Sequence, residues 1–126
     1  MDYLPLFMNV THRRCLLVGA GEVASRKAAL LSRCGAHLVV VAPWISDEVR
    51  ALAAQTELEL HERPFQDGDL EEVDLVIAAT DDPAVNIRVS ELARQRRLPV
   101  NVVDQPDLCS FIVPAIVDRS PVVIAI

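Results

Sequence analysis

The residues best suited to do chemistry are three small ones at fixed spacing. Gly19, Gly21 and Ala24 fit the pattern G-x-G-x-x-[GA]. The apolar run 15–18 comes directly before them, and a helical pattern over 24–34 follows. In that setting Gly19 permits a tight turn, Gly21 lets a pyrophosphate approach the backbone, and Ala24 lets the helix pack close to the strand. The free N–H groups of the helix start then face the phosphates, so the sequence predicts dinucleotide binding.

A carboxylate follows the last strand that we expect, residues 99–103. Asp104 stands there, and Asp107 lies three residues further on. In an open α/β sheet, ligands bind beyond the carboxyl ends of the strands, so Asp104 is the best candidate for a general base and Asp107 is the second. A turn cap before Pro106 explains Asp104 equally well from its position alone.

The segment after the second expected strand does not identify the nucleotide. An acidic residue usually binds the ribose about 20 residues beyond the glycines, but Val41, Ala42 and Pro43 stand there. No arginine replaces the acid, so the motif does not distinguish NAD from NADP. Trp44 either covers an adenine or ribose or packs as a surface aromatic.

Small residues also end the expected strand 73–79. Ala79 and Thr80 would let the backbone approach a cofactor. Asp81 and Asp82 come next, just before a helical pattern, and this position favours a helix cap over catalysis.

Strands alternate with helices along the chain, which predicts a Rossmann-like, doubly wound, mostly parallel sheet. Residues 4–10 are apolar, and we expect them to lie extended against the sheet edge. Apolar runs also occupy 111–117 and 121–126. The strands expected in the sheet are 15–18, 37–41, 57–61, 73–79 and 99–103, and the helices are 24–34, one beginning after Ser46 and one beginning near Asp82.

Composition limits the classes of function. The 126 residues suit one domain, and the net charge of −6 argues against general nucleic-acid or anionic-membrane binding. The three cysteines lack C-x-x-C spacing and indicate buried thiols in a reducing compartment. The three histidines are too scattered for a metal site. Without a signal peptide or a membrane-length apolar run, the chain is expected to be cytoplasmic.

Several motifs in a fixed order carry a resemblance to a known family. Together they resemble the N-terminal domain of sirohaem synthase, the precorrin-2 dehydrogenase / sirohydrochlorin ferrochelatase family. The resemblance covers almost the whole chain. The motifs are 1–7 (MDYLPLF), 18–24 (VGAGEVA), 26–28 (RKA), 78–82 (AATDD) with Asn86, 101–104 (NVVD), 110–114 (SFIVP) and 118–121 (DRSP).

The resemblance implies a function and site residues. It implies NAD-dependent oxidation of precorrin-2 to sirohydrochlorin, followed by insertion of ferrous iron, with tetrapyrrole and iron as substrates. Asp104 takes the place of the family's acid/base aspartate. Family contacts with NAD fall on Glu22, Val23, Pro43 and Trp44, where the backbone matters more than the side chain. Because the substrate carries many carboxylates, we expect arginines near the cleft.

The resemblance also implies a domain organisation. Residues 1–113 form the NAD-binding domain, and 114–126 begin a dimerisation segment that is truncated here. The chain stops inside an apolar run, which predicts a fragment of a longer polypeptide, and the resemblance implies that the full-length protein is a homodimer. An alternative from another class is a non-catalytic regulatory module that senses a dinucleotide, like the nucleotide-gated domains of potassium uptake systems. Those domains usually keep an acidic residue after the second strand.

Overall fold

The computed structural model describes residues 1–126. None of its helices combines the length and the hydrophobicity that spanning a bilayer requires. The elements in chain order are β1 (Arg14–Val18), α1 (Glu22–Arg33), β2 (His37–Ala42), α2 (Asp47–Gln55), β3 (Leu58–Glu62), the 3₁₀ turn η1 (Asp67–Leu70), β4 (Leu75–Ala78), α3 (Pro83–Gln95), β5 (Val100–Val102), the 3₁₀ turn η2 (Pro106–Leu108), β6 (Ile116–Arg119) and β7 (Val122–Ala125).

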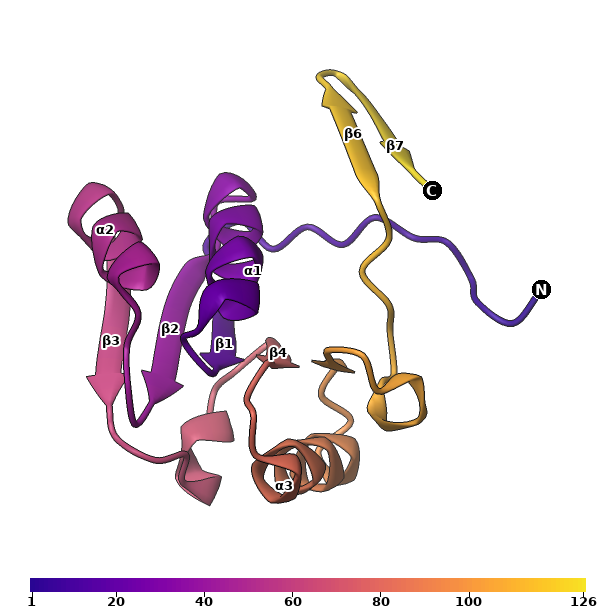
Figure 1. The fold of residues 1–126 in the computed structure, drawn as a ribbon. Helices are drawn as coiled ribbons and strands as arrows, with labels where there is room; N and C mark the ends of the chain where they lie inside the picture. The colour runs from indigo at the N-terminus through magenta and orange to yellow at the C-terminus, as the bar shows by residue number, and fades with distance from the viewer.

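Five strands form one sheet in the order β3-β2-β1-β4-β5. All four neighbouring pairs are parallel. Helices α1 and α2 cover one face and α3 covers the other (Figure 1). The expected doubly wound, Rossmann-like sheet is therefore confirmed, and the strand order reverses between β1 and β4, where such folds bind ligands.

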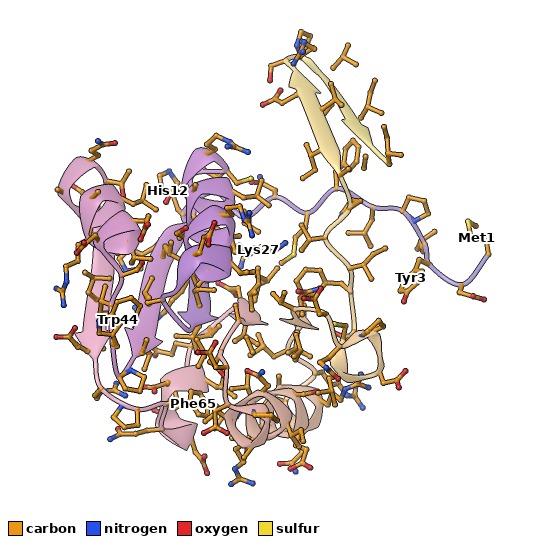
Figure 2. The ribbon with its side chains drawn as sticks, in the orientation of Figure 1. Met1, Tyr3, His12, Lys27, Trp44 and Phe65 are labelled. Carbon is orange, nitrogen blue, oxygen red and sulfur yellow. The ribbon has the colours of Figure 1, made fainter.

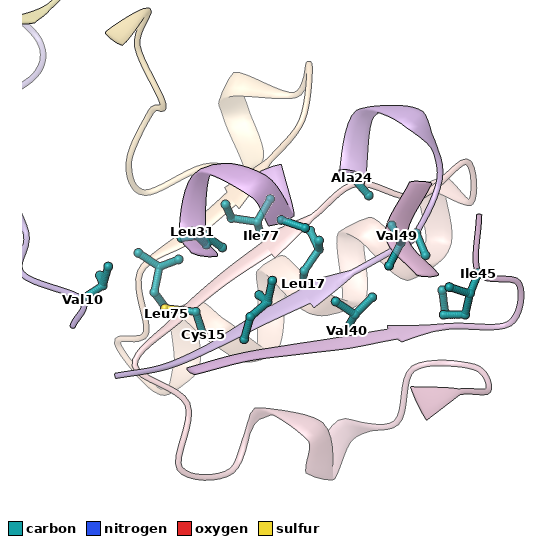
Figure 3. Packing of buried hydrophobic residues seen from close by; sticks show 14 residues of the cluster. Val10, Cys15, Leu17, Ala24, Leu31, Val40, Ile45, Val49, Leu75 and Ile77 are labelled. Carbon is teal, nitrogen blue, oxygen red and sulfur yellow. The ribbon is translucent and has the colours of Figure 1, made fainter. Parts of the chain in front are cut away.

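Alternating side chains of the central strands build two cores. In β1, Cys15 and Leu17 face the cluster under α1 and α2, which Figure 3 shows, whereas Leu16 and Val18 face the cluster under α3. Strands buried on both faces read as continuous apolar runs, which is why β1 shows no polar alternation in the sequence. Packing on both faces thereby fixes the positions of the carboxyl ends of these strands.

The N-terminal segment differs from the expectation. Residues 1–9 are exposed and pair with no strand, and Val10 is the first buried residue. The outer edge of β5 is taken instead by Ser110, whose N–H donates to Val100 O at 2.8 Å and whose Oγ accepts from Val100 N at 2.9 Å. The predicted packing of residues 4–10 against the sheet edge is therefore wrong.

The chain after η2 leaves the main sheet. Strands β6 and β7 pair with each other as an antiparallel hairpin, and every residue of both strands is exposed. Figure 1 shows the hairpin standing apart from the five-stranded sheet.

The cysteines differ in part from the expectation of buried thiols. All three are free, but only Cys15 is buried, whereas Cys34 is exposed and Cys109 is half-buried. Burial raises the pKa of the Cys15 thiol from 9.0 to about 11, so this thiol stays protonated and inert at neutral pH.

One ion pair fixes the connection between β3 and β4. Arg63 donates to Asp69 through two nitrogens, at 2.9 and 2.7 Å. Asp69 also accepts from Gln66 N at 2.8 Å. Burial raises the pKa of the Asp69 carboxyl, but the hydrogen bonds from Arg63 and Gln66 lower it more, so this pKa lies below its ordinary value of 3.8.

Replacing Asp69 by asparagine tests this connection. We expect Asp69→Asn to cost about 1–3 kcal/mol of unfolding free energy at neutral pH, since charged hydrogen bonds are lost. Because the folded-state pKa is depressed, the stabilisation is present above pH 3.8 and disappears as the pH falls through the folded-state value. Denaturant unfolding at several pH values measures the difference. The control is Asp67→Asn, which breaks an exposed pair with Arg88 and should change stability little. Equal losses in both variants would contradict the account.

Candidate functional site

The glycine turn after β1 is shaped by a close approach to β4. Gly19 has a φ of +114°, and a Cβ at this position would lie 2.2 Å from Ala79 O. Gly19 N donates to Val41 O at 2.9 Å, and Ala79 N donates to Val18 O at 2.8 Å. Only glycine fits where the ends of β1, β2 and β4 meet, so Gly19 serves the turn itself.

Gly21 stands in a different environment. A Cβ at Gly21 would meet nothing within 4 Å, so the protein alone does not demand glycine there. Gly21 is the N-cap of α1 and offers no side chain to the helix. No group of the protein accepts from the N–H groups of Glu22, Val23 or Ala24. This open, donor-rich cradle fits a pyrophosphate, as the sequence predicts.

The other two α-helices begin differently. In α2, Ser46 Oγ accepts from Val49 N at 3.3 Å. In α3, Asp82 Oδ1 accepts from Ala84 N at 3.0 Å. Since both of these helix starts are capped by side chains, α1 alone among the three presents its first N–H groups without a cap.

The loop after β2 is tied to the glycine turn. Ser46 N donates to Ala20 O at 3.0 Å, and Ile45 is buried. Pro43 and Trp44 consequently lie exposed beside the turn, and Trp44 is 67% exposed (Figure 2). Trp44 is therefore not packed against the protein surface, and its ring is available to an adenine or ribose. The NAD contacts assigned to Pro43 and Trp44 stay a prediction.

The loop after β4 is held by its own side chains. Thr80 Oγ1 lies 2.7 Å from Asn86 Oδ1, and Asn86 Nδ2 donates to Thr80 O at 3.1 Å. Of the two candidate caps, Asp82 is the one that caps α3, whereas the carboxylate of Asp81 makes no hydrogen bond or ion pair. This loop keeps Ala79 directly beside Gly19, where its backbone lines the approach to the turn.

Asp104 follows β5 with a φ of +61°, a conformation that aspartate tolerates better than most residues. The flanking backbone is fixed, because Val103 N donates to Ala78 O at 3.0 Å and Gln105 N donates to Val102 O at 3.1 Å. The side chain is exposed, and its carboxylate accepts no hydrogen bond. The capping alternative for Asp104 is therefore wrong, and its carboxylate is free to act on a ligand.

A cavity of about 260 Å³ opens beside Asp104. Its wall includes four polar residues that sequence reasoning missed as site residues: Lys27, Asn101, Gln105 and Cys109. A polar residue inside the apolar strand β5 was a usable signal for Asn101, whose Nδ2 donates to Phe111 O at 3.0 Å. The lining residues are Lys27, Asn101, Val102, Val103, Asp104, Gln105, Pro106, Cys109, Ile112 and Val113.

A second hollow, of about 350 Å³, lies against β1–β3 and shares no residue with the first. Most of its charged groups are paired with one another, and the side chains of Glu71 and Glu72 are the exceptions. Glu59 Oε2 lies 2.9 Å from His61 Nε2 and 3.3 Å from Arg14 Nη2. The hydrogen bond from His61 and the charge of Arg14 lower the pKa of the Glu59 carboxyl. These groups satisfy each other, so the hollow is a solvated ion-pair surface.

Glycine variants separate the two roles in the turn. Gly21→Asp should leave folding intact, because the added side chain meets open space, and should weaken NAD⁺ binding by more than about tenfold by blocking and repelling the pyrophosphate. Gly19→Ala should instead destabilise the fold by roughly 3 kcal/mol or more through its clash with Ala79 O. Calorimetry and thermal unfolding measure the two effects. Gly68→Asp, at another open position, is the matched control and should bind NAD⁺ normally. Unchanged affinity in folded Gly21→Asp would remove the turn from the binding site.

Known proteins resemble this chain over its full length. A siroheme synthase from Nitrosospira multiformis is 51% identical over 130 residues, and one from Pseudomonas aeruginosa is 57% identical over 126 residues. Each alignment covers 100% of this chain but only 28% and 27% of the relative. The chain thus spans just over a quarter of these relatives, and the resemblance stated from the motifs is confirmed.

Solved structures also resemble this chain. The precorrin-2 dehydrogenase SirC superposes with a TM-score of 0.83 at 27% identity, over 98% of this chain and 61% of SirC. D-Lactate dehydrogenase from Escherichia coli superposes with a TM-score of 0.58 at 13% identity, over 82% of this chain and 32% of the dehydrogenase, and shares the fold alone. Residues 6–115 match a sequence family described as "Putative NAD(P)-binding". The chain, with its glycine turn and open α1 start, belongs to this NAD(P)-binding family.

Proposed function

We propose that this chain is the dehydrogenase domain of a sirohaem synthase, which oxidises precorrin-2 to sirohydrochlorin with NAD⁺. The observation that carries the proposal is the free carboxylate of Asp104 at the rim of a cavity, on the same sheet edge as the uncapped start of α1. The siroheme synthases and the precorrin-2 dehydrogenase described above support the substrate class.

The reaction removes a hydride and a proton from the tetrapyrrole. Bound NAD⁺ supplies the hydride acceptor. The open N–H groups of α1 hold the pyrophosphate, and the backbone near Ala79 lines the approach to the turn. Asp104 takes the proton from the tetrapyrrole, and a new double bond forms as the hydride leaves. Its carboxylate has no competing hydrogen bond, so it can accept that proton.

NAD is the cofactor that we assign to the glycine turn, in keeping with the family that the chain matches. Residues 43–45 carry no charge, so neither an acid for a ribose 2′-hydroxyl nor a cation for a 2′-phosphate stands there. The nearby Arg50 is paired with Glu62. Gly19, Gly21, Glu22, Val23 and Ala24 form the phosphate turn.

Iron insertion is the second activity that we propose for the longer protein. Histidine, cysteine and acidic side chains form no group of three that could hold a metal ion. In this proposal ferrous iron is a substrate and not a resident cofactor. Asp104 is this chain's candidate for accepting pyrrole protons, and the remainder of the longer protein completes the chelatase site. We place the protein in the cytoplasm, whose reducing conditions suit three free cysteines.

We further propose that residues 1–113 form the NAD-binding domain and that 114–126 belong to a dimerisation segment of a homodimer. The match to the NAD(P)-binding family ends at residue 115, close to the start of β6. Exposed apolar side chains cluster on the hairpin, as is typical of a protein–protein interface. They are Ile116, Val117, Val122, Val123, Ile124 and Ile126.

Sedimentation of the 126-residue chain tests the role of the hairpin. We expect concentration-dependent self-association, because apolar strands with free edges pair with other chains. The double variant Val122→Glu/Ile124→Glu should shift the chain to monomer by placing charges on β7. Ile87→Glu, at an exposed position on α3, is the control and should leave association unchanged. A wild-type chain that stays monomeric at high concentration would contradict the proposal.

Replacing Asp104 in the full-length protein tests the chemistry. Asparagine is the better replacement, because it tolerates the left-handed backbone of residue 104, whereas alanine there would add a cost of about 1 kcal/mol. Asp104→Asn should keep the melting temperature and NAD⁺ affinity and should lower precorrin-2 oxidation by about 10²–10⁴-fold. Asp107→Asn is the matched control, since Asp107 lies outside the cavity wall.

Two results would contradict this assignment. Near wild-type turnover in Asp104→Asn would remove Asp104 from the mechanism, and a loss of turnover in Asp107→Asn instead would move the role to Asp107. NAD⁺ binding without any precorrin-2 oxidation by the wild-type full-length protein would favour the regulatory module over the enzyme.

A further inference from the structure

The cavity beside Asp104 contains a single cation. Lys27 is the only lysine of the chain, and no arginine joins it in the cavity wall. Five of the eleven arginines form ion pairs with acidic side chains, at Arg13, Arg14, Arg50, Arg63 and Arg88. Lys27 forms neither an ion pair nor a hydrogen bond and is only half-buried. Its ammonium group is therefore available to a ligand.

The position of Lys27 follows from how α1 packs. Ala24, Ala28 and Leu31 are the buried residues of this helix, and Lys27 lies next to that stripe, three residues after Ala24 and four before Leu31. Figure 2 shows Lys27 on the side of α1 that faces β4 and the chain after β5. Helix α3 covers the opposite face of β4 and β5, so the side chain borders open space.

The rest of the cavity wall indicates what this cation meets. The apolar residues Val102, Val103, Pro106, Ile112 and Val113 make up half of the lining. Apolar walls suit the face of a large ring, whereas a carboxylate at the ring's edge needs a cation. Asp104 itself repels such a carboxylate, and a nearby ammonium group offsets that repulsion.

We infer that Lys27 binds a peripheral carboxylate of the tetrapyrrole and thereby orients the macrocycle against Asp104. This inference rests on the proposed function. Sequence reasoning expected arginines for this task, but the geometry places the lone lysine there. An ammonium group on a flexible stem can follow a carboxylate whose position changes with ring conformation.

Enzyme kinetics of the full-length protein test the inference. Lys27→Gln should raise the KM for precorrin-2 roughly tenfold, as expected for the loss of one charge-assisted hydrogen bond, and should leave kcat within about twofold. The KM of the variant should also depend less on salt than that of the wild type. Lys27→Arg should restore most of the affinity. The matched control is Arg26→Gln, which removes an exposed, unpaired cation from the neighbouring position on α1 and should behave like the wild type.

The outcomes separate this inference from the proposed function. If the wild type oxidises precorrin-2 and Lys27→Gln, with an unchanged melting temperature, shows the same KM, the carboxylate contact is wrong while the proposed function stands. An NAD⁺ dissociation constant that rises together with the KM would assign Lys27 to the pyrophosphate and overturn the inference. If the wild-type full-length protein does not oxidise precorrin-2, the proposed function fails first.

Discussion

The site depends on the close approach of two chain segments at Gly19. The carbonyl of Ala79 occupies the place that a side chain of residue 19 would need, 2.2 Å from its Cβ position. Three backbone hydrogen bonds then join the strand ends in series, from Gly19 N to Val41 O, from Ala79 N to Val18 O and from Val103 N to Ala78 O. The glycine turn and Asp104 are thus linked through the ends of β1, β4 and β5. A change at Gly19 would disturb both the nucleotide cradle and the carboxylate, although they lie far apart in the sequence.

Electrostatics divide the site into two parts. The phosphate cradle uses uncapped backbone N–H groups at the start of α1, so it needs no cationic side chain. The cavity next to it carries one carboxylate and one ammonium group, and half of its lining residues are apolar. The proposed function relies on this division, because the chain carries a net charge of −6 while both NAD⁺ and the proposed substrate carry anionic groups. The repulsion of the whole molecule acts at long range and is screened by salt, whereas the contacts act at hydrogen-bond distance.

Local signals predicted the sheet and the nucleotide turn well. Apolar runs such as 15–18 identify strands that are buried on both faces, and small residues such as Ala24 mark close helix packing. The strand boundaries moved by one or two residues, as at β4, where Asp74 accepts from Arg14 N at 3.2 Å before the strand begins. Contacts between distant segments were not predictable. Residues 4–10 are apolar enough for a sheet edge, but Ser110 already occupies the edge of β5. Nothing in the sequence around Lys27 indicates that the chain after β5 lies beside it.

The most direct test of the central claim is the stoichiometry of the reaction. Purified full-length protein is incubated with precorrin-2 and NAD⁺, and NADH and sirohydrochlorin are measured in the same sample. A dehydrogenase built on this cradle and carboxylate predicts that the two products form in equimolar amounts and that neither forms without NAD⁺. Sirohydrochlorin that appears at the same rate without NADH formation, or bound NAD⁺ that is never reduced in the presence of precorrin-2, would contradict it.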